Sequence, residues 1–144
     1  MNTRMLAAKI TAIAGSVLLL FPVAFMLVIS IPGSIMRGSF IMDFLIPAEL
    51  GLFVLIGALL LLAGAILGKR QVKLVAIGIG LLVLTIVGGQ LLAMASGLAT
   101  STDAEPEGPA FLLVIGSIIL YDIFTVLLGI VGVRLSISLF RKEG

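Results

Sequence analysis

Four long apolar runs dominate this chain, and charged or turn-forming residues separate them. A bilayer core of ~30 Å needs ~20 helical residues per crossing, so each run is long enough for a transmembrane helix. The sequence therefore predicts an all-α integral membrane protein, a single four-helix bundle whose surroundings are the lipid bilayer. The expected spans are residues 10–31, 47–67, 74–98 and 109–133.

Composition supports this class and narrows the chemistry. Of the 144 residues, 61% are hydrophobic and 11% are charged, more apolar surface than a soluble domain of this size could bury. The chain has no Cys, His or Trp, which excludes disulfides, Ser-His-Asp triads and metal or haem sites built on Cys or His. We expect no cofactor and no metal. The net charge of +2 does not indicate nucleic-acid binding, because the basic residues lie beside the membrane segments.

Proline residues set the expected ends of the first two helices. Pro32 predicts that the first helix ends at residue 31. Pro47 is predicted to begin the second helix, with Glu49 in its first turn, where an acid is favourable. Residues 39–46 would then form a separate segment at the outer interface. The alternative is one long, kinked second helix.

Lysine and arginine residues are divided unequally between the two ends of the predicted bundle. Eight lie in the N-terminus, the second loop and the C-terminal tail, whereas Arg37 alone lies in the first or third loop. Basic residues in short loops stay in the cytoplasm, so both termini are predicted to be cytoplasmic. The compact chain and its short loops favour the cytoplasmic (inner) membrane of a prokaryote. The amphipathic tail after Arg134 is expected to continue the fourth helix.

Asp122 is the acid inside the fourth run, and it falls near the bilayer midplane. An acid there costs ~2.5–3.5 kcal/mol on insertion scales, so we expect it to face the bundle interior, beside Thr125 and Gly129. Three roles are open. A protonated Asp122 could hydrogen-bond to a neighbouring helix, it could bind a proton or cation along a pathway, or it could pair with a basic residue of another membrane protein.

Three more polar residues are candidates for an intramembrane site. Thr85 of the third run is expected at the depth of Asp122, and Gln90 ~6–8 Å nearer the outside, by helical rise. Gln90 shares a stripe with Ala93, so it is also expected to face inward. Tyr121 directly precedes Asp122. The sequence therefore places any intramembrane function between the third and fourth helices.

Two acids are expected at the outer mouth of the bundle, Asp43 and Glu49. An acidic mouth could attract cations. The simpler interpretation is that these acids are solvated, and that Glu49 suits the start of a helix.

Glycine is abundant inside the spans, with 17 residues in the chain. Small residues let membrane helices approach closely, and Gly64 and Gly68 have GxxxG spacing. We expect these glycines to serve packing within one bundle rather than a dedicated dimer seam.

The candidate residues form a poor catalytic set, because a lone acid lacks a nucleophile, a metal set or a second acid. The GxGD motif of intramembrane aspartyl proteases is absent. We therefore predict a small non-enzymatic membrane protein, a subunit or modulator of an assembly with another membrane protein or with further copies of itself. The alternative is an oligomeric proton- or cation-coupled transporter or channel that uses Asp122 and Gln90.

Overall fold

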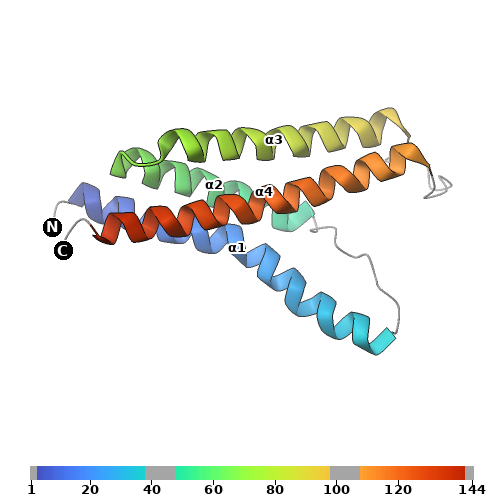
Figure 1. Ribbon diagram of the computed structural model, residues 1–144, viewed down its shortest axis with the longest axis horizontal. Helices are drawn as coiled ribbons and strands as arrows, with labels where there is room; N and C mark the ends of the chain where they lie inside the picture. Colours follow the sequence, from blue (N-terminus) through green and yellow to red (C-terminus); the bar gives the residue numbers. More distant parts are fainter. Residues whose placement is uncertain (1–2, 38–47, 98–107, 142–144) are drawn as a thin grey trace.

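The computed structural model describes residues 3–37, 48–97 and 108–141, and no strand occurs in these ranges. Four helices, each long and apolar enough to cross a membrane, account for nearly all of them (Figure 1). The predicted all-α, four-helix membrane fold is confirmed. The helices are α1 (Thr3–Arg37), α2 (Ala48–Gly68), α3 (Val72–Ala95) and α4 (Pro109–Phe140).

α2 matches its predicted span to within one residue at each end, and α3 is shifted by two to three residues toward the N-terminus. The largest departure is in α1, which begins at Thr3 instead of residue 10. That helix continues through Pro32 to Arg37, so the prediction that Pro32 ends it is wrong. Proline removes one backbone donor, and helices of membrane proteins tolerate this loss where neighbouring groups compensate for it. α4 also extends beyond its predicted span, past residue 133 to Phe140, as expected for the amphipathic tail. The predicted interfacial segment, residues 39–46, lies outside the described residues.

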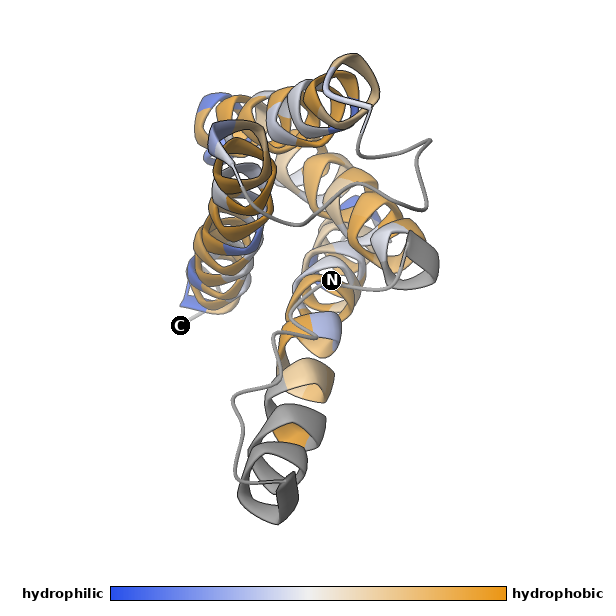
Figure 2. Cartoon of the chain, turned by 90° about the vertical axis from the view of Figure 1, so that its right-hand side faces the viewer, coloured by the Kyte–Doolittle hydropathy of each residue, from blue (hydrophilic) through white to orange (hydrophobic). Residues whose placement is uncertain are grey.

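The helices are not packed equally. α1 packs mainly against α2 and α4, and α3 packs mainly against α4, whereas α2 barely touches α3 or α4. Within one apolar 18-residue stretch of each helix, 39% of the residues are buried inside the protein in α1 and 33% in α2, but only 11% in α3 and in α4. Figure 2 shows apolar residues on outer as well as inner faces of the helices. Lipid or a partner must therefore cover most of α3 and α4.

Glycines bring α1 and α2 together backbone to backbone. A β-carbon at Gly15 would lie 2.6 Å from the Leu61 backbone nitrogen and 2.7 Å from the Gly57 carbonyl oxygen. A β-carbon at Gly64 would lie 2.9 Å from the Ala12 backbone nitrogen. No side chain fits between the helices at these points, so glycine is required for their close approach.

Other glycines lie where α4 contacts α1 and α2. A β-carbon at Gly129 would meet the Leu20 side chain, and one at Gly68 would meet the Leu139 side chain. The two glycines of the GxxxG pair thus contact different helices, because Gly64 faces α1 and Gly68 faces α4. This is the expected use of small residues within one bundle.

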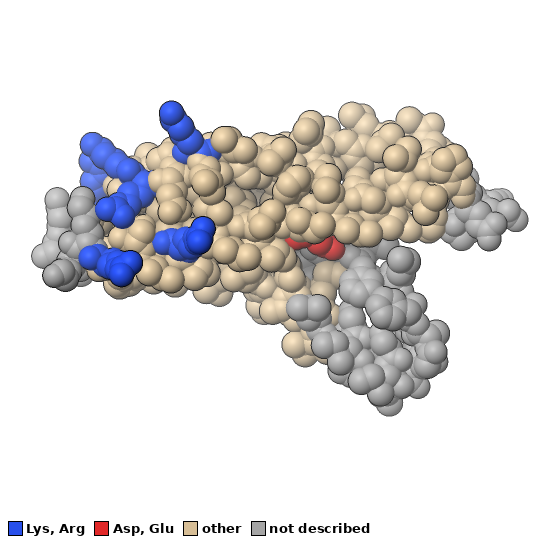
Figure 3. Space-filling model, viewed as in Figure 1, with Lys and Arg blue, Asp and Glu red and all other residues tan. Residues whose placement is uncertain are grey.

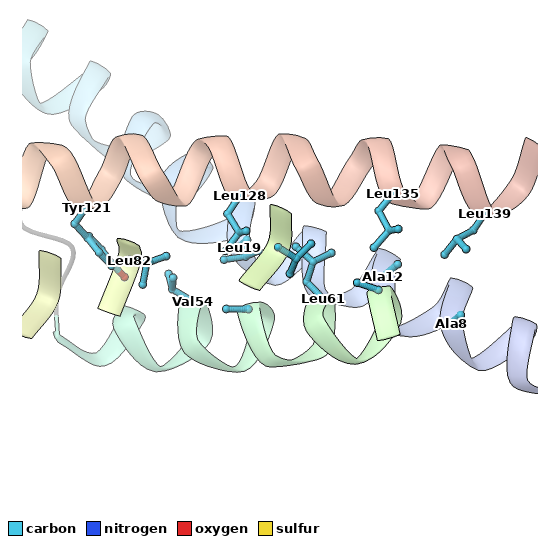
Figure 4. Close-up of a cluster of buried hydrophobic side chains, with 13 residues drawn as sticks. Ala8, Ala12, Leu19, Val54, Leu61, Leu82, Tyr121, Leu128, Leu135 and Leu139 are labelled. Carbon is cyan, nitrogen blue, oxygen red and sulfur yellow. The ribbon is translucent and has the colours of Figure 1, made fainter. Parts of the chain in front are cut away.

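Between α4 and the α1–α2 pair, the buried side chains form one apolar row, to which α3 adds Val75 and Leu82 (Figure 4). The row follows α4 from Tyr121 to Leu139, near the C-terminus of that helix. Its labelled members are Ala8, Ala12, Leu19, Val54, Leu61, Leu82, Tyr121, Leu128, Leu135 and Leu139.

Both chain termini and the α2–α3 turn lie at the same end of the molecule (Figure 1). Lysine and arginine side chains gather there, and we call it the basic end (Figure 3). The turn is short, and Lys69 and Gln71 both adopt left-handed backbone conformations, with φ of 51° and 54°. The basic residues described at this end are Arg4, Lys9, Lys69, Arg70, Lys73, Arg134 and Arg141.

Candidate functional site

Asp122 lies near the middle of α4 and is half-buried. Its Oδ1 atom is inaccessible to solvent and has no hydrogen-bond partner among the described residues. The residue flanks the buried face of α4, to which Tyr121 and Thr125 belong. Asp122 therefore lies at the border between the packed face of α4 and its exposed face, with one oxygen turned inward and unsatisfied.

Tyr121 is buried and points from α4 toward Leu82 of α3 (Figure 4). Its hydroxyl also lacks a hydrogen-bond partner among the described residues. The nearby Thr125 hydroxyl donates to the Tyr121 backbone carbonyl at 2.9 Å, so its proton is used within α4. Two unsatisfied polar atoms therefore lie on consecutive residues in an apolar helix.

The α3–α4 register places Thr85 at the level of this pair. Gly78 faces Leu128 and Gly89 faces Ser117, and interpolation between these contacts sets Thr85 opposite Tyr121. The Thr85 hydroxyl nevertheless donates to carbonyl oxygens of its own helix, at 3.1 Å to Leu81 and 2.8 Å to Leu82. Thr85 shares the expected depth, but its hydroxyl proton is directed to α3.

Gln90 is exposed, so the prediction that it faces the bundle interior is wrong. The preceding residue, Gly89, is the one that faces α4, where a β-carbon would lie 2.6 Å from the Ser117 Oγ atom. Successive helical residues are turned by ~100°, which directs Gln90 away from that contact. Gln90 does not join Asp122 in a common site within the chain.

Of the two acids expected at the outer mouth, Glu49 lies in the first turn of α2, since that helix begins at Ala48. This is the helix position for which an acid is suited. Asp43 lies outside the described residues, so an acidic outer mouth stays a prediction.

Lys9 is a buried residue that the sequence reasoning did not single out. It is 4% exposed, and its Nζ atom lies 4.6 Å from the centre of the Phe140 ring. This cation–π contact joins the start of α1 to the end of α4. The sequence offered little indication that Lys9 is buried, because a lysine before an apolar run is normally interpreted as a topology determinant.

Chemically, the site is a buried, unpaired carboxyl oxygen on the residue next to a tyrosine with an unpaired hydroxyl, near the middle of α4. Such a pair can accept or donate hydrogen bonds and can hold a proton, but neither the Thr85 nor the Thr125 hydroxyl is directed to it. Among the described residues, no group of three or more acids gathers that could hold a metal ion. Comparisons of the chain with known protein families, curated proteins and solved structures found no match.

Proposed function

We propose that this protein is a small, non-enzymatic, multi-pass subunit or modulator of a membrane assembly, and that Asp122 lies at the contact with a partner helix. The observation that carries the proposal is the buried Oδ1 atom of Asp122, which has no hydrogen-bond partner among the described residues. In hydrocarbon an unsatisfied polar group costs several kcal/mol. Asp122 as a whole is half-buried, so a transmembrane segment from another chain can reach its exposed side and donate a hydrogen bond to the carboxyl group there.

The surface beside Asp122 supports a contact of this kind. Ile119 and Ile123 lie on the side of Asp122 away from Tyr121 and Thr125, and both are large, exposed apolar side chains. A partner helix that packs on them would also cover the carboxyl group. The low burial of α3 and α4 leaves room for such a helix.

The proposal includes an orientation and a location. The residues of the basic end come from both termini and the α2–α3 turn, and short basic segments stay on the cytoplasmic side. We therefore place both termini in the cytoplasm and the protein in the cytoplasmic membrane of a prokaryote. Cysteines introduced at residues 2 and 70 should resist a membrane-impermeant thiol reagent in intact cells. Labelling of either one would contradict this orientation.

Site-specific photo-cross-linking in native membranes tests the contact. A photoreactive amino acid at Ile119 should give a cross-link to one membrane protein or to a second copy of the chain. The yield should fall when Asp122→Leu is added. The matched control is the same probe at Leu91, which is similarly exposed but lies on α3. Cross-links at Ile119 that persist undiminished with Asp122→Leu would contradict a role for the acid.

The second candidate is an oligomeric proton- or cation-coupled transporter or channel. The observation that favours it is the same unpaired carboxyl group near mid-membrane, since ionisable groups at that depth mark ion pathways in many transporters. Asp122→Asn should then abolish coupled flux in liposomes while the protein stays folded. Full flux with Asn would exclude this role.

A further inference from the structure

Two pockets adjoin at the basic end, and neither belongs to the Asp122 site. The first is a groove of about 700 Å³ between α1 and α4. Its apolar lining is Ile13 and Val17 of α1 with Val133, Ile137 and Phe140 of α4.

The second pocket, of about 470 Å³, is lined by Arg70, Arg134, Ser138 and Arg141. Ile137 and Arg141 line both pockets, so the two are neighbours across one ridge of α4.

Helical spacing brings the arginines of α4 together. Arg134, Ser138 and Arg141 are separated by four and three residues, so they share one face of α4. Arg70 joins them from the α2–α3 turn. No acid is among the described residues that line the pocket, so its charge is uncompensated there. Guanidinium groups match the geometry of phosphate oxygens, which makes phosphate the anion best suited to this pocket.

The start of α3 adds positive potential beside Arg70. Residue 71 caps this helix without any side-chain hydrogen bond to the first N–H groups. The N-terminus of a helix carries a partial positive charge that favours anions. This partial charge adds to the attraction of the arginines for an anion, but it would be too weak to bind an anion by itself.

We infer that the two pockets together bind one anionic phospholipid of the leaflet at the basic end. The phosphate lies among Arg70, Arg134 and Arg141, and an acyl chain lies in the groove between α1 and α4. The groove begins at Phe140 beside the arginines and runs toward Val17, deeper in the membrane, which is the direction in which an acyl chain leaves its headgroup. Basic pockets between transmembrane helices are suited to anionic headgroups. This inference rests on the membrane location alone and is independent of the role proposed for Asp122.

The chain contains no tryptophan, so Val17→Trp would place a single tryptophan in the groove, and its fluorescence can be excited selectively. The full-length protein is reconstituted in phosphatidylcholine vesicles that contain brominated phosphatidylglycerol as a minor component. A matched sample contains the same mole fraction of brominated phosphatidylcholine. We expect the brominated anionic lipid to quench Val17→Trp more strongly than the brominated neutral lipid.

Ile77→Trp is the matched control for position. Ile77 is 64% exposed and Val17 is 60% exposed, and the helix register puts them within about one turn of the same depth. Ile77 lies on α3 and lines neither pocket. Both brominated lipids should quench Ile77→Trp equally.

The arginines are tested in the Val17→Trp background. Arg134→Gln with Arg141→Gln should weaken the preference for the anionic lipid roughly fivefold per arginine removed. Arg4→Gln with Lys73→Gln removes the same charge from the same end but leaves both pockets intact, and should keep the preference. Both double variants change exposed side chains, and equal quenching by brominated phosphatidylcholine in each checks that the groove is preserved.

Three outcomes would overturn the inference. Equal quenching of Val17→Trp by the two lipids would show that the groove has no headgroup preference. An equal loss of preference in the two double variants would show an effect of general surface charge rather than a site. Quenching of Ile77→Trp but not of Val17→Trp by either lipid would show that another protein segment covers the groove.

Discussion

The α1–α2 and α3–α4 pairs are both antiparallel neighbours, but they pack in different ways. Between α1 and α2, Gly15, Gly57 and Gly64 allow contact between backbones. Between α3 and α4, glycines of α3 receive the side chains of Leu128 and Ser117. Membrane helices associate through close packing and hydrogen bonds rather than through the hydrophobic effect. The first pair therefore stabilises the fold, and the second carries the unsatisfied polar atoms and leaves most of its surface open to other molecules.

The largest expected effect is at the backbone contact of α1 and α2. Gly15→Ala should lower the free energy of unfolding by about 3 kcal/mol, because the new methyl group meets backbone atoms that cannot rotate away. Unfolding in mixed detergent–SDS micelles, followed by circular dichroism, measures this change. Gly80→Ala on α3 is the control, since apart from the adjoining backbone of α3 no described atom lies within 4 Å of its β-carbon position. If the two variants were equally stable, the close backbone contact of α1 and α2 would not distinguish that pair from α3 and α4.

Asp122→Leu should stabilise the isolated chain, by about 2 kcal/mol in the same unfolding assay. The reason is that the buried Oδ1 atom has no partner among the described residues, so its replacement loses no hydrogen bond. If Asp122 instead served as a hydrogen-bond donor between helices of this chain, Leu would destabilise the protein and Asn would be tolerated. The sign of the change therefore separates a structural role from a role in contacting a partner.

Gly89→Ala should cost about 1 kcal/mol, less than Gly15→Ala, because the Ser117 Oγ atom can rotate away from the new methyl group. The Ser117 hydroxyl donates to the Val114 carbonyl at 2.7 Å, so this rotation breaks a hydrogen bond within α4. Adding Ser117→Ala should recover part of the loss. A double-mutant cycle that shows no coupling between the two positions would place the α3–α4 contact elsewhere.

The smallest expected effect is the coupling between Lys9 and Phe140, about 0.5–1 kcal/mol for a cation–π contact. A double-mutant cycle with Lys9→Met and Phe140→Leu measures it and cancels any other interaction of either residue. A coupling energy indistinguishable from zero would mean that the ammonium group does not hold the ends of α1 and α4 together.

The four helices could be predicted from the sequence because the length of an apolar run decides whether it spans a bilayer. Which side of each helix faces the bundle interior could not be predicted. α3, for example, is apolar all the way round and has no polar stripe to orient it. Gln90 was therefore placed on the wrong face. Pro32 led to a wrong end for the first helix, because a proline ends a helix less reliably in a membrane than in water.

The candidate site was predictable in part. Asp122 is conspicuous as an acid in an apolar run, and alternating helix directions were enough to place Thr85 near its depth. The direction of the Thr85 hydroxyl depends on its rotamer, which a sequence does not reveal. The pocket of Arg70, Arg134 and Arg141 combines a turn with the end of a distant helix, so it emerges only from their arrangement in space.

The short α2–α3 turn has a mechanical consequence. α3 has few contacts with α2, yet the turn at Lys69–Gln71 ties the two helices together at the basic end. A rotation of α3 about this turn would therefore separate α3 from α4 more widely at the level of Thr85 and Tyr121 than at the level of Arg70.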